Sequence, residues 1–212
     1  MSLPNGAWSL YLCTPIRDDL VEFVTACVAG GVGVVQLRDK VHDDRELLIA
    51  AERLASCCGA LQVPFLVNDR CDVALAVGAD GVHVGQDDLP VQTCRDLLGD
   101  DAIVGLSTHA PGELDAALDE AVSYLSAGPV EATPTKPGRP GTGVAYAAAA
   151  ARCAMVPVYV TGGVSVASVP GLVAAGLRHF VVVRALTESS DPASAARELT
   201  DAIARAVSVQ PA

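Results

Sequence analysis

Short apolar segments rich in Val, Ile and Tyr alternate along this chain with longer Ala- and Leu-rich segments of helical character. The apolar segments show little polar alternation, which is typical of strands buried on both faces of a parallel sheet. We expect eight strands, at residues 9–13, 32–37, 65–67, 81–84, 103–106, 124–126, 158–160 and 180–183. Helices are expected after them at residues 20–28, 46–57, 72–76, 91–98, 113–121, 146–153, 168–175 and 193–207.

Eight successive strand–helix units predict a closed barrel. Such a barrel usually needs about 250 residues, so a chain of 212 residues would form a compact one with short loops. The runner-up is an open, doubly wound sheet, but no G-x-G-x-x-G follows the first strand, and the polar clusters are spread over many strand ends. The predicted fold class is therefore α/β, a single compact (β/α)8 TIM barrel over residues 1–212.

Charge and hydropathy disfavour several classes of protein. The formal net charge of −11 disfavours nucleic acid as a partner, because its phosphates must be met by clustered cations. No apolar run approaches the roughly 20 residues that span a bilayer, and residues 1–6 lack an export signal, so we expect a cytoplasmic protein that does not span membranes. Seven cysteines without a C-x-x-C pair argue against a disulfide framework or a zinc site, so most are expected to be buried thiols. The sequence leaves open whether the chain forms a homo-oligomer.

Polar residues follow nearly every predicted strand. Catalytic groups of such barrels lie at the carboxyl ends of the strands, so these clusters are expected to meet on one face. Alternate residues of an extended segment point to the same side, which would let Gln36, Arg38 and Lys40 reach one ligand. The other candidates are Asn68 and Asp69 after the third strand, Asp88 after the fourth, Ser107 after the fifth, Thr133, Thr135 and Lys136 after the sixth, Gly162 and Gly163 after the seventh, and Val183 and Arg184 at the eighth. For any one cluster, the alternative is an ordinary solvated loop.

Six phrases occur in an order and spacing that resemble a known enzyme family: QLRDK, NDR, ADGVHVGQDD, GLSTH, GPVEATPTKPGR and VTGGV. Through them the chain resembles the thiamine-phosphate synthase (thiamine monophosphate pyrophosphorylase) family, from Tyr11 to about Ala206. The resemblance implies a (β/α)8 barrel that joins hydroxymethylpyrimidine pyrophosphate to hydroxyethylthiazole phosphate. The implied products are thiamine phosphate and pyrophosphate, which makes the expected enzyme a transferase.

Asp69 and Asp88 are the metal ligands that this resemblance predicts. Their hard carboxylate oxygens suit Mg²⁺, which is commonly held by one or two carboxylates together with substrate phosphate oxygens. The family pattern selects Asp88 over the neighbouring Asp87. The structural alternative is that Asp69 caps the helix that follows it.

The pyrimidine pyrophosphate is expected to bind residues that bring positive charge or hydrogen-bonding groups. Arg38, Lys40 and Lys136 would neutralise the departing pyrophosphate. Ser107 would donate its hydroxyl to the same group, and it is the fourth predicted catalytic residue. Two further members of the set have amide groups that suit the edge of the pyrimidine. The complete set is Gln36, Arg38, Lys40, Asn68, Ser107 and Lys136. The alternative for the cations is surface ion pairing.

The thiazole phosphate is expected in the loops after strands seven and eight. Gly162 and Gly163 let the backbone approach an anion closely, and N–H groups at the start of the following helix would point at it. Arg184 stands where the family usually has Ser, and it would add a charged contact. Prolines around Thr135 would stiffen a loop that closes over the site, and the alternative is a surface turn. The complete set is Thr133, Thr135, Gly162, Gly163, Val183 and Arg184.

Two other functions compete with synthase chemistry. A thiazole tautomerase of the same barrel family would need the thiazole phosphate site and a proton-carrying group such as His109, but not the diphosphate residues. A non-catalytic barrel that binds a phosphorylated ligand would need no chemistry. His83 is expected in the core or behind the site, and Trp8, Tyr11 and the cysteines are expected to be structural.

Overall fold

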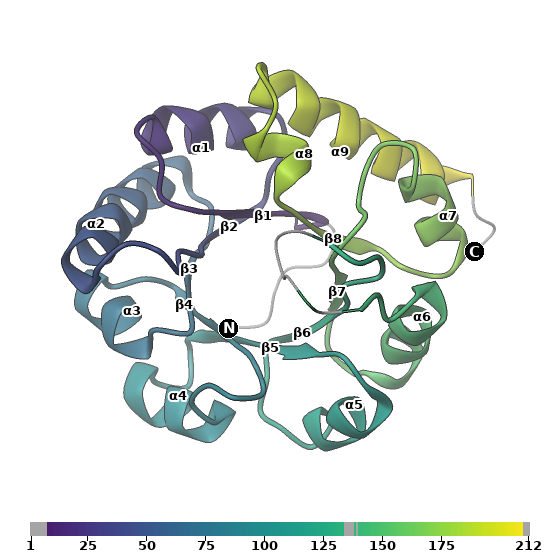
Figure 1. The fold of residues 1–212 in the computed structure, drawn as a ribbon, viewed down its shortest axis with the longest axis horizontal. Coiled ribbons are helices and arrows are strands. Elements are labelled where there is room, and N and C mark those ends of the chain that lie inside the picture. The colour runs from purple at the N-terminus through teal and green to yellow at the C-terminus, as the bar shows by residue number, and fades with distance from the viewer. Residues whose placement is uncertain (1–7, 134–137, 139, 210–212) are drawn as a thin grey trace.

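The computed structural model describes residues 8–133, 138 and 140–209. Parallel strands form a closed barrel at its centre, in which each strand pairs with the next and β8 returns to β1 (Figure 1). The strands are β1 (Leu10–Thr14), β2 (Val34–Leu37), β3 (Phe65–Asn68), β4 (Gly81–Val84), β5 (Ile103–Thr108), β6 (Tyr124–Ala127), β7 (Val158–Val160) and β8 (His179–Val182). The predicted (β/α)8 barrel is confirmed.

The helices surround the barrel (Figure 1). They are α1 (Leu20–Ala29), α2 (Asp44–Leu61), α3 (Cys71–Val77), α4 (Val91–Leu98), α5 (Pro111–Ala117), α6 (Val144–Cys153), α7 (Val169–Ala174), α8 (Arg184–Thr187) and α9 (Pro192–Ser208). α2 begins before its predicted start because the Asp43 carboxylate accepts a hydrogen bond from Glu46 N at 2.9 Å in a capping box. α5 ends before its predicted end because the chain turns there to bring Ser123 N to a β5 carbonyl at 2.7 Å. α8 is absent from the predicted set, since four residues cannot show a helical period.

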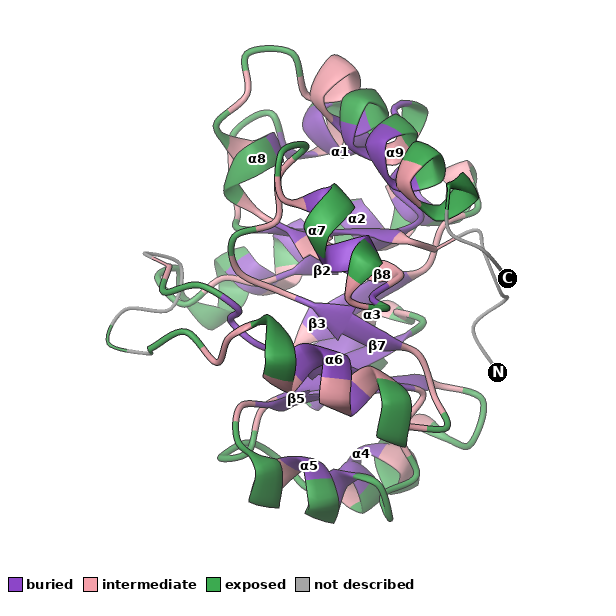
Figure 2. Cartoon of the chain, turned by 90° about the vertical axis from the view of Figure 1, so that its right-hand side faces the viewer, coloured by how far each residue is buried: buried purple, intermediate pink, exposed green. Residues whose placement is uncertain are grey.

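Alternate strand residues build two separate apolar cores. One set of side chains packs against the helices and forms the large core between sheet and helices, and most strand residues are buried (Figure 2). The other set fills the centre of the barrel with Tyr11, Val34, Leu66, Ile103, Tyr124 and Tyr159. The three tyrosine rings meet edge to face, with centroids 5.2 to 5.9 Å apart. The centre of the barrel is therefore filled with packed side chains.

Gly105 makes room for one of these rings. It pairs with Tyr124 across β5 and β6, and a Cβ atom at Gly105 would lie 2.1 Å from Tyr124 Cζ. No side chain can occupy that space without moving the tyrosine, so glycine is needed here for close approach. The result is a tyrosine whose hydroxyl lies in the barrel interior, where polar partners can meet it.

The composition makes one prediction about the thiols that the structure confirms. Five of the seven cysteines are buried, Cys57 is half-buried and Cys153 is exposed, and none of them forms a disulfide in the part of the chain that the structure describes. Among the helices of the described residues, none is long and apolar enough to cross a membrane.

Candidate active site

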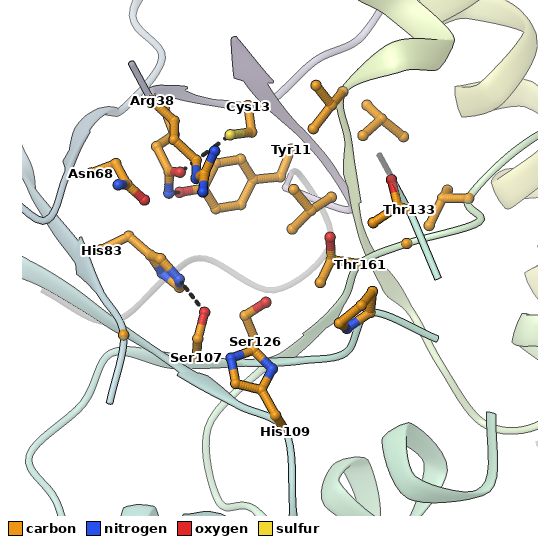
Figure 3. A pocket seen from close by; sticks show the side chains of 18 of the residues that line it. Tyr11, Cys13, Arg38, Asn68, His83, Ser107, His109, Ser126, Thr133 and Thr161 are labelled. Atoms are coloured by element: carbon orange, nitrogen blue, oxygen red, sulfur yellow. Dashed lines mark hydrogen bonds between the residues drawn. The ribbon is translucent and has the colours of Figure 1, made fainter. Parts of the chain in front are cut away.

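A pocket of about 560 Å³ lies at the carboxyl ends of the strands (Figure 3). Every strand of the barrel contributes to its lining, either directly or through the residues that follow it. Thr135 and Lys136 lie outside the described residues. The other predicted site residues all line this pocket: Gln36, Arg38, Lys40, Asn68, Asp69, Asp88, Ser107, Thr133, Gly162, Gly163, Val183 and Arg184.

The alternation of the strands explains this convergence. Ile103 lies in the core at the centre of the barrel, and Ser107 lies four residues further along the same strand. Val34 and Gln36 have the same relation on β2, where Val34 belongs to the central core and Gln36 lines the pocket. Because side chains two residues apart share one face of a strand, apolar residues below place polar residues above them at the pocket.

The segment that carries Arg38 and Lys40 is held by the carboxylate between them. Asp39 accepts hydrogen bonds from the backbone N–H groups of Ile16, Val41 and His42 at 2.8 to 3.1 Å. Its side chain is 4% exposed and lies 3.0 Å from His42 Nδ1. Burial alone would raise the pKa of Asp39, but these hydrogen bonds outweigh it and lower the pKa to about 2. Asp39 is therefore ionised at neutral pH and fixes the loop from which two cations reach the pocket.

The two predicted metal ligands lie side by side. Asp69 and Asp88 interact through their carboxyl groups, and Asp88 Oδ2 also accepts a hydrogen bond from Gly85 N at 2.8 Å. Lys40 Nζ forms an ion pair with Asp69. Burial raises the pKa of Asp69 and the neighbouring Asp88 adds to this, while Lys40 opposes it. Two carboxylates brought together against their mutual repulsion, next to an ammonium group, form a site with affinity for cations.

The capping alternative for Asp69 is wrong. Arg70, not Asp69, is the residue at the amino-terminal cap of α3, and its side chain makes no capping hydrogen bond. Asp69 instead adopts a φ of 61°, while its N–H donates to the His83 carbonyl at 2.8 Å. Non-glycine residues adopt this left-handed conformation rarely, and mostly at turns or functional sites. The backbone at this point turns the carboxylate into the pocket.

Asp69 and Asp88 could supply part of the ligand set of a Mg²⁺ ion. Within the described residues, no group of three His, Cys, Asp or Glu side chains could hold a metal ion by itself. Mg²⁺ is commonly bound by one or two carboxylates while substrate phosphates and water complete its octahedron. The chemistry of Asp69 and Asp88 therefore suits a metal that binds together with a phosphorylated substrate.

The predicted phosphate loop lies across the pocket from the carboxylates. Gly162 and Gly163 have φ values of 82° and 77°, and a Cβ atom on Gly162 would lie 2.4 Å from Pro129 Cβ. The helix after these glycines, α7, begins at Val169, one residue after its predicted start, and residues 164–168 lie between the glycines and the helix. The chain uses the residues between for a Ser165–Ser168 turn. Arg184 is exposed and lines the pocket at the start of α8.

Tyr11 is a pocket residue that the sequence interpretation missed. It was expected to be structural, but its hydroxyl accepts a hydrogen bond from Gln36 Nε2 at 2.7 Å and it lines the pocket. Tyr124 lines the pocket as well, with its hydroxyl 2.8 Å from His83 Nδ1. Both tyrosines lie two residues before a residue that lines the pocket near the end of the same strand, Cys13 on β1 and Ser126 on β6. His83, which was expected in the core or behind the site, is buried and hydrogen-bonded to Ser107, but it also lines the pocket.

Comparison with known proteins gives consistent matches. Residues 10–186 match the family model described as thiamine monophosphate synthase. The thiamine-phosphate synthase of Thermobifida fusca (strain YX) is 49% identical, over 90% of this chain and 89% of that protein. The thiamine-phosphate synthase of Mycolicibacterium smegmatis is 43% identical, over 93% of each. Among solved structures, the thiamine phosphate pyrophosphorylase from Pyrococcus furiosus has a TM-score of 0.84 at 27% identity, covering 95% of this chain and 98% of that one.

Proposed function

The chain belongs to the thiamine monophosphate synthase family and is a transferase with thiamine-phosphate synthase activity, and we propose that the pocket at the carboxyl ends of the strands is its active site. The reaction joins hydroxymethylpyrimidine pyrophosphate to hydroxyethylthiazole phosphate and releases pyrophosphate. The pocket must therefore hold two anionic substrates within a protein whose net charge is −11. Cations gathered locally at the pocket are needed to do this.

We assign the pyrophosphate to the part of the pocket near Arg38, Lys40 and Ser107. Negative charge grows on the pyrophosphate as its bond to the pyrimidine methylene breaks. Fixed positive groups and a hydroxyl donor stabilise this charge more in the transition state than in the bound substrate, which raises the rate. Lys136 completes the proposed set from outside the described residues. Gln36 and Asn68 are proposed to bind the pyrimidine edge.

We assign Mg²⁺ to Asp69 and Asp88. The bound ion would supply charge neutralisation for the leaving pyrophosphate. The support is the adjacent pair of carboxylates, the ion pair of Asp69 with Lys40, and the position of all three at the pocket. In this assignment Lys40 contacts both the ligand Asp69 and the pyrophosphate, so the metal and the leaving group share one end of the pocket.

The thiazole phosphate is assigned to the opposite end. The proposed contacts are backbone N–H groups near Gly162 and Gly163, the segment around Val183, and the guanidinium of Arg184. An Arg can grip a phosphate with two parallel hydrogen bonds, which a Ser at the same position cannot do. The remaining contacts come from Thr133 and from Thr135, of which the latter lies outside the described residues.

The single observation that carries this assignment is the meeting of Lys40, Asp69 and Asp88 at one pocket. A thiazole tautomerase or a barrel that only binds a phosphate would need neither a cation site nor a second anion site. We also propose a cytoplasmic location, because both substrates carry phosphate charges that are costly to move through a bilayer. The whole chain is proposed to act as one barrel domain.

The metal assignment is tested with Asp69→Asn and Asp88→Asn, using Asp87→Asn as the matched control. Asparagine keeps the shape of each side chain and tolerates the left-handed backbone at Asp69. We expect both ligand variants to lose Mg²⁺-dependent turnover and to lose Mg²⁺ binding measured by calorimetry in the presence of pyrophosphate. The control is expected to keep both properties. Normal turnover in either ligand variant would contradict the assignment.

A further inference from the structure

A continuous network of hydrogen bonds between buried side chains lines the pocket and joins residues of β1, β2, β4, β5 and β6. Ser107 Oγ lies 2.8 Å from His83 Nε2 (Figure 3). His83 Nδ1 lies 2.8 Å from the Tyr124 hydroxyl. The Tyr124 and Tyr11 hydroxyls are 2.9 Å apart, and Gln36 Nε2 donates to Tyr11 at 2.7 Å. We call this set, Ser107, His83, Tyr124, Tyr11 and Gln36, the buried network.

The direction of these hydrogen bonds follows from the orientation of Gln36. Its Oε1 accepts a hydrogen bond from Cys13 Sγ at 3.3 Å, which directs Nε2 toward Tyr11. The Tyr11 oxygen receives that hydrogen, so the phenol donates its own hydrogen to Tyr124. Burial raises the pKa of both tyrosines well above the usual value, so each carries one hydrogen at neutral pH. Tyr124 then donates to His83 Nδ1.

This direction decides whether Ser107 donates or accepts a hydrogen bond at the pocket. When His83 Nδ1 accepts, the ring hydrogen lies on Nε2 and is donated to Ser107 Oγ. The hydroxyl hydrogen of Ser107 is then directed away from His83 and toward a ligand in the pocket. A phosphate oxyanion needs such a donor. With the opposite direction, Ser107 would donate to His83 and would present only lone pairs to the anion.

We propose that Tyr11, Tyr124 and His83 are positioning residues that make Ser107 a hydrogen-bond donor and hold the Gln36 amide in one orientation. The two ends of the network are the groups assigned to the pyrimidine pyrophosphate, so this inference rests on the proposed function. Gly162, Gly163 and the other thiazole phosphate contacts are not members of the network. The network therefore sets the affinity and reactivity of one substrate and not of the other.

Tyr159 offers a matched control for Tyr124. It is equally buried, and its ring contacts those of Tyr11 and Tyr124 at centroid distances of 5.3 and 5.2 Å. Its hydroxyl, however, donates to the Trp8 carbonyl at 2.7 Å, outside the network. Tyr124→Phe and Tyr159→Phe thus each remove one buried hydroxyl from the same cluster of rings, but only Tyr124→Phe interrupts the path from Gln36 to Ser107.

The experiment measures kinetics with both substrates in the two variants. We expect Tyr124→Phe to lower kcat/KM for the pyrimidine pyrophosphate about tenfold, while KM for the thiazole phosphate stays within about twofold. Tyr159→Phe is expected to keep both parameters within about twofold of the unmodified protein. Equal effects of the two variants, or equal weakening of both substrates in Tyr124→Phe, would overturn the proposal. If Tyr124→Phe does not fold, Tyr11→Phe interrupts the network at the next link and is measured instead.

A second measurement needs no substrate. Long-range ¹⁵N–¹H NMR of histidine-labelled protein, with His83→Gln to assign the signal, reports which imidazole nitrogen carries hydrogen. We expect hydrogen on Nε2 only, and hydrogen on Nδ1 would overturn the proposed direction. If the unmodified protein forms no thiamine phosphate, the proposed function fails, whereas the NMR result still tests the network. If the unmodified protein is active and the two phenylalanine variants are alike, the network alone fails.

Discussion

Replacing Asp39 by asparagine is expected to loosen the loop that brings Arg38 and Lys40 to the pocket. The carboxylate is 4% exposed and accepts three backbone N–H groups, which an amide oxygen can satisfy only in part. Its pKa falls from 3.8 to about 2 on folding. One pKa unit corresponds to about 1.4 kcal/mol, so the fall corresponds to about 2 kcal/mol. Because the His42 partner is 37% exposed and its attraction is screened, we expect a net loss of about 1–2 kcal/mol.

The pH dependence of this loss gives a sharper test. The folded pKa lies below the unfolded one, so the stabilisation is fully present above the unfolded pKa and is lost as pH falls through the folded value near 2. Urea unfolding of the unmodified protein and of Asp39→Asn should differ most near pH 7 and converge toward pH 2. Asp119→Asn makes the same change of net charge at an exposed position and serves as the control. A difference that stays constant from pH 7 to pH 3 would refute the reasoning.

Three further substitutions test the packing at the centre of the barrel and the two proposed anion sites. Gly105→Ala would place a Cβ atom 2.1 Å from Tyr124 Cζ, so we expect a loss of about 1–3 kcal/mol or more in the free energy of unfolding, measured in urea; an unchanged midpoint would contradict the packing. Arg184→Ser is expected to raise KM for the thiazole phosphate and leave that for the pyrimidine pyrophosphate nearly unchanged. A lower melting temperature with normal kinetics would instead make Arg184 structural. Lys136→Ala is expected to lower kcat, because the transition state loses roughly 2–4 kcal/mol of stabilisation. Lys136→Arg is expected to restore part of the activity. Full activity in the alanine variant would remove Lys136 from the site.

The fold could be predicted from the sequence because burial on both faces of each strand leaves a pattern along the chain. The apolar runs mark the strands to within two residues, since the parallel barrel needs apolar side chains toward the helices. Helix ends were harder to predict. The start of α2 depends on the Asp43 side chain, and α8 is a single turn shaped by its surroundings.

The site could be predicted in part for the same reason. Residues at or just after the end of a strand, such as Ser107 and Asp69, are placed by the barrel itself, and the motifs of the family identify them. Tyr11 and Tyr124 could not be recognised in this way, because inside an apolar run a tyrosine has the pattern of a core residue. Their roles depend on partners far apart in sequence: the Tyr11 and Tyr124 hydroxyls meet across 113 positions. Only the closed barrel brings such pairs together.

The most direct test of the account is turnover with both substrates. Purified protein, freed of divalent ions by chelation, is given the pyrimidine pyrophosphate and the thiazole phosphate, and pyrophosphate and thiamine phosphate are measured together as Mg²⁺ is added. The account predicts that the two products appear in equal amounts, only when both substrates are present, and only after Mg²⁺ is added. Pyrophosphate release without the thiazole phosphate, or full turnover without any divalent ion, would contradict it.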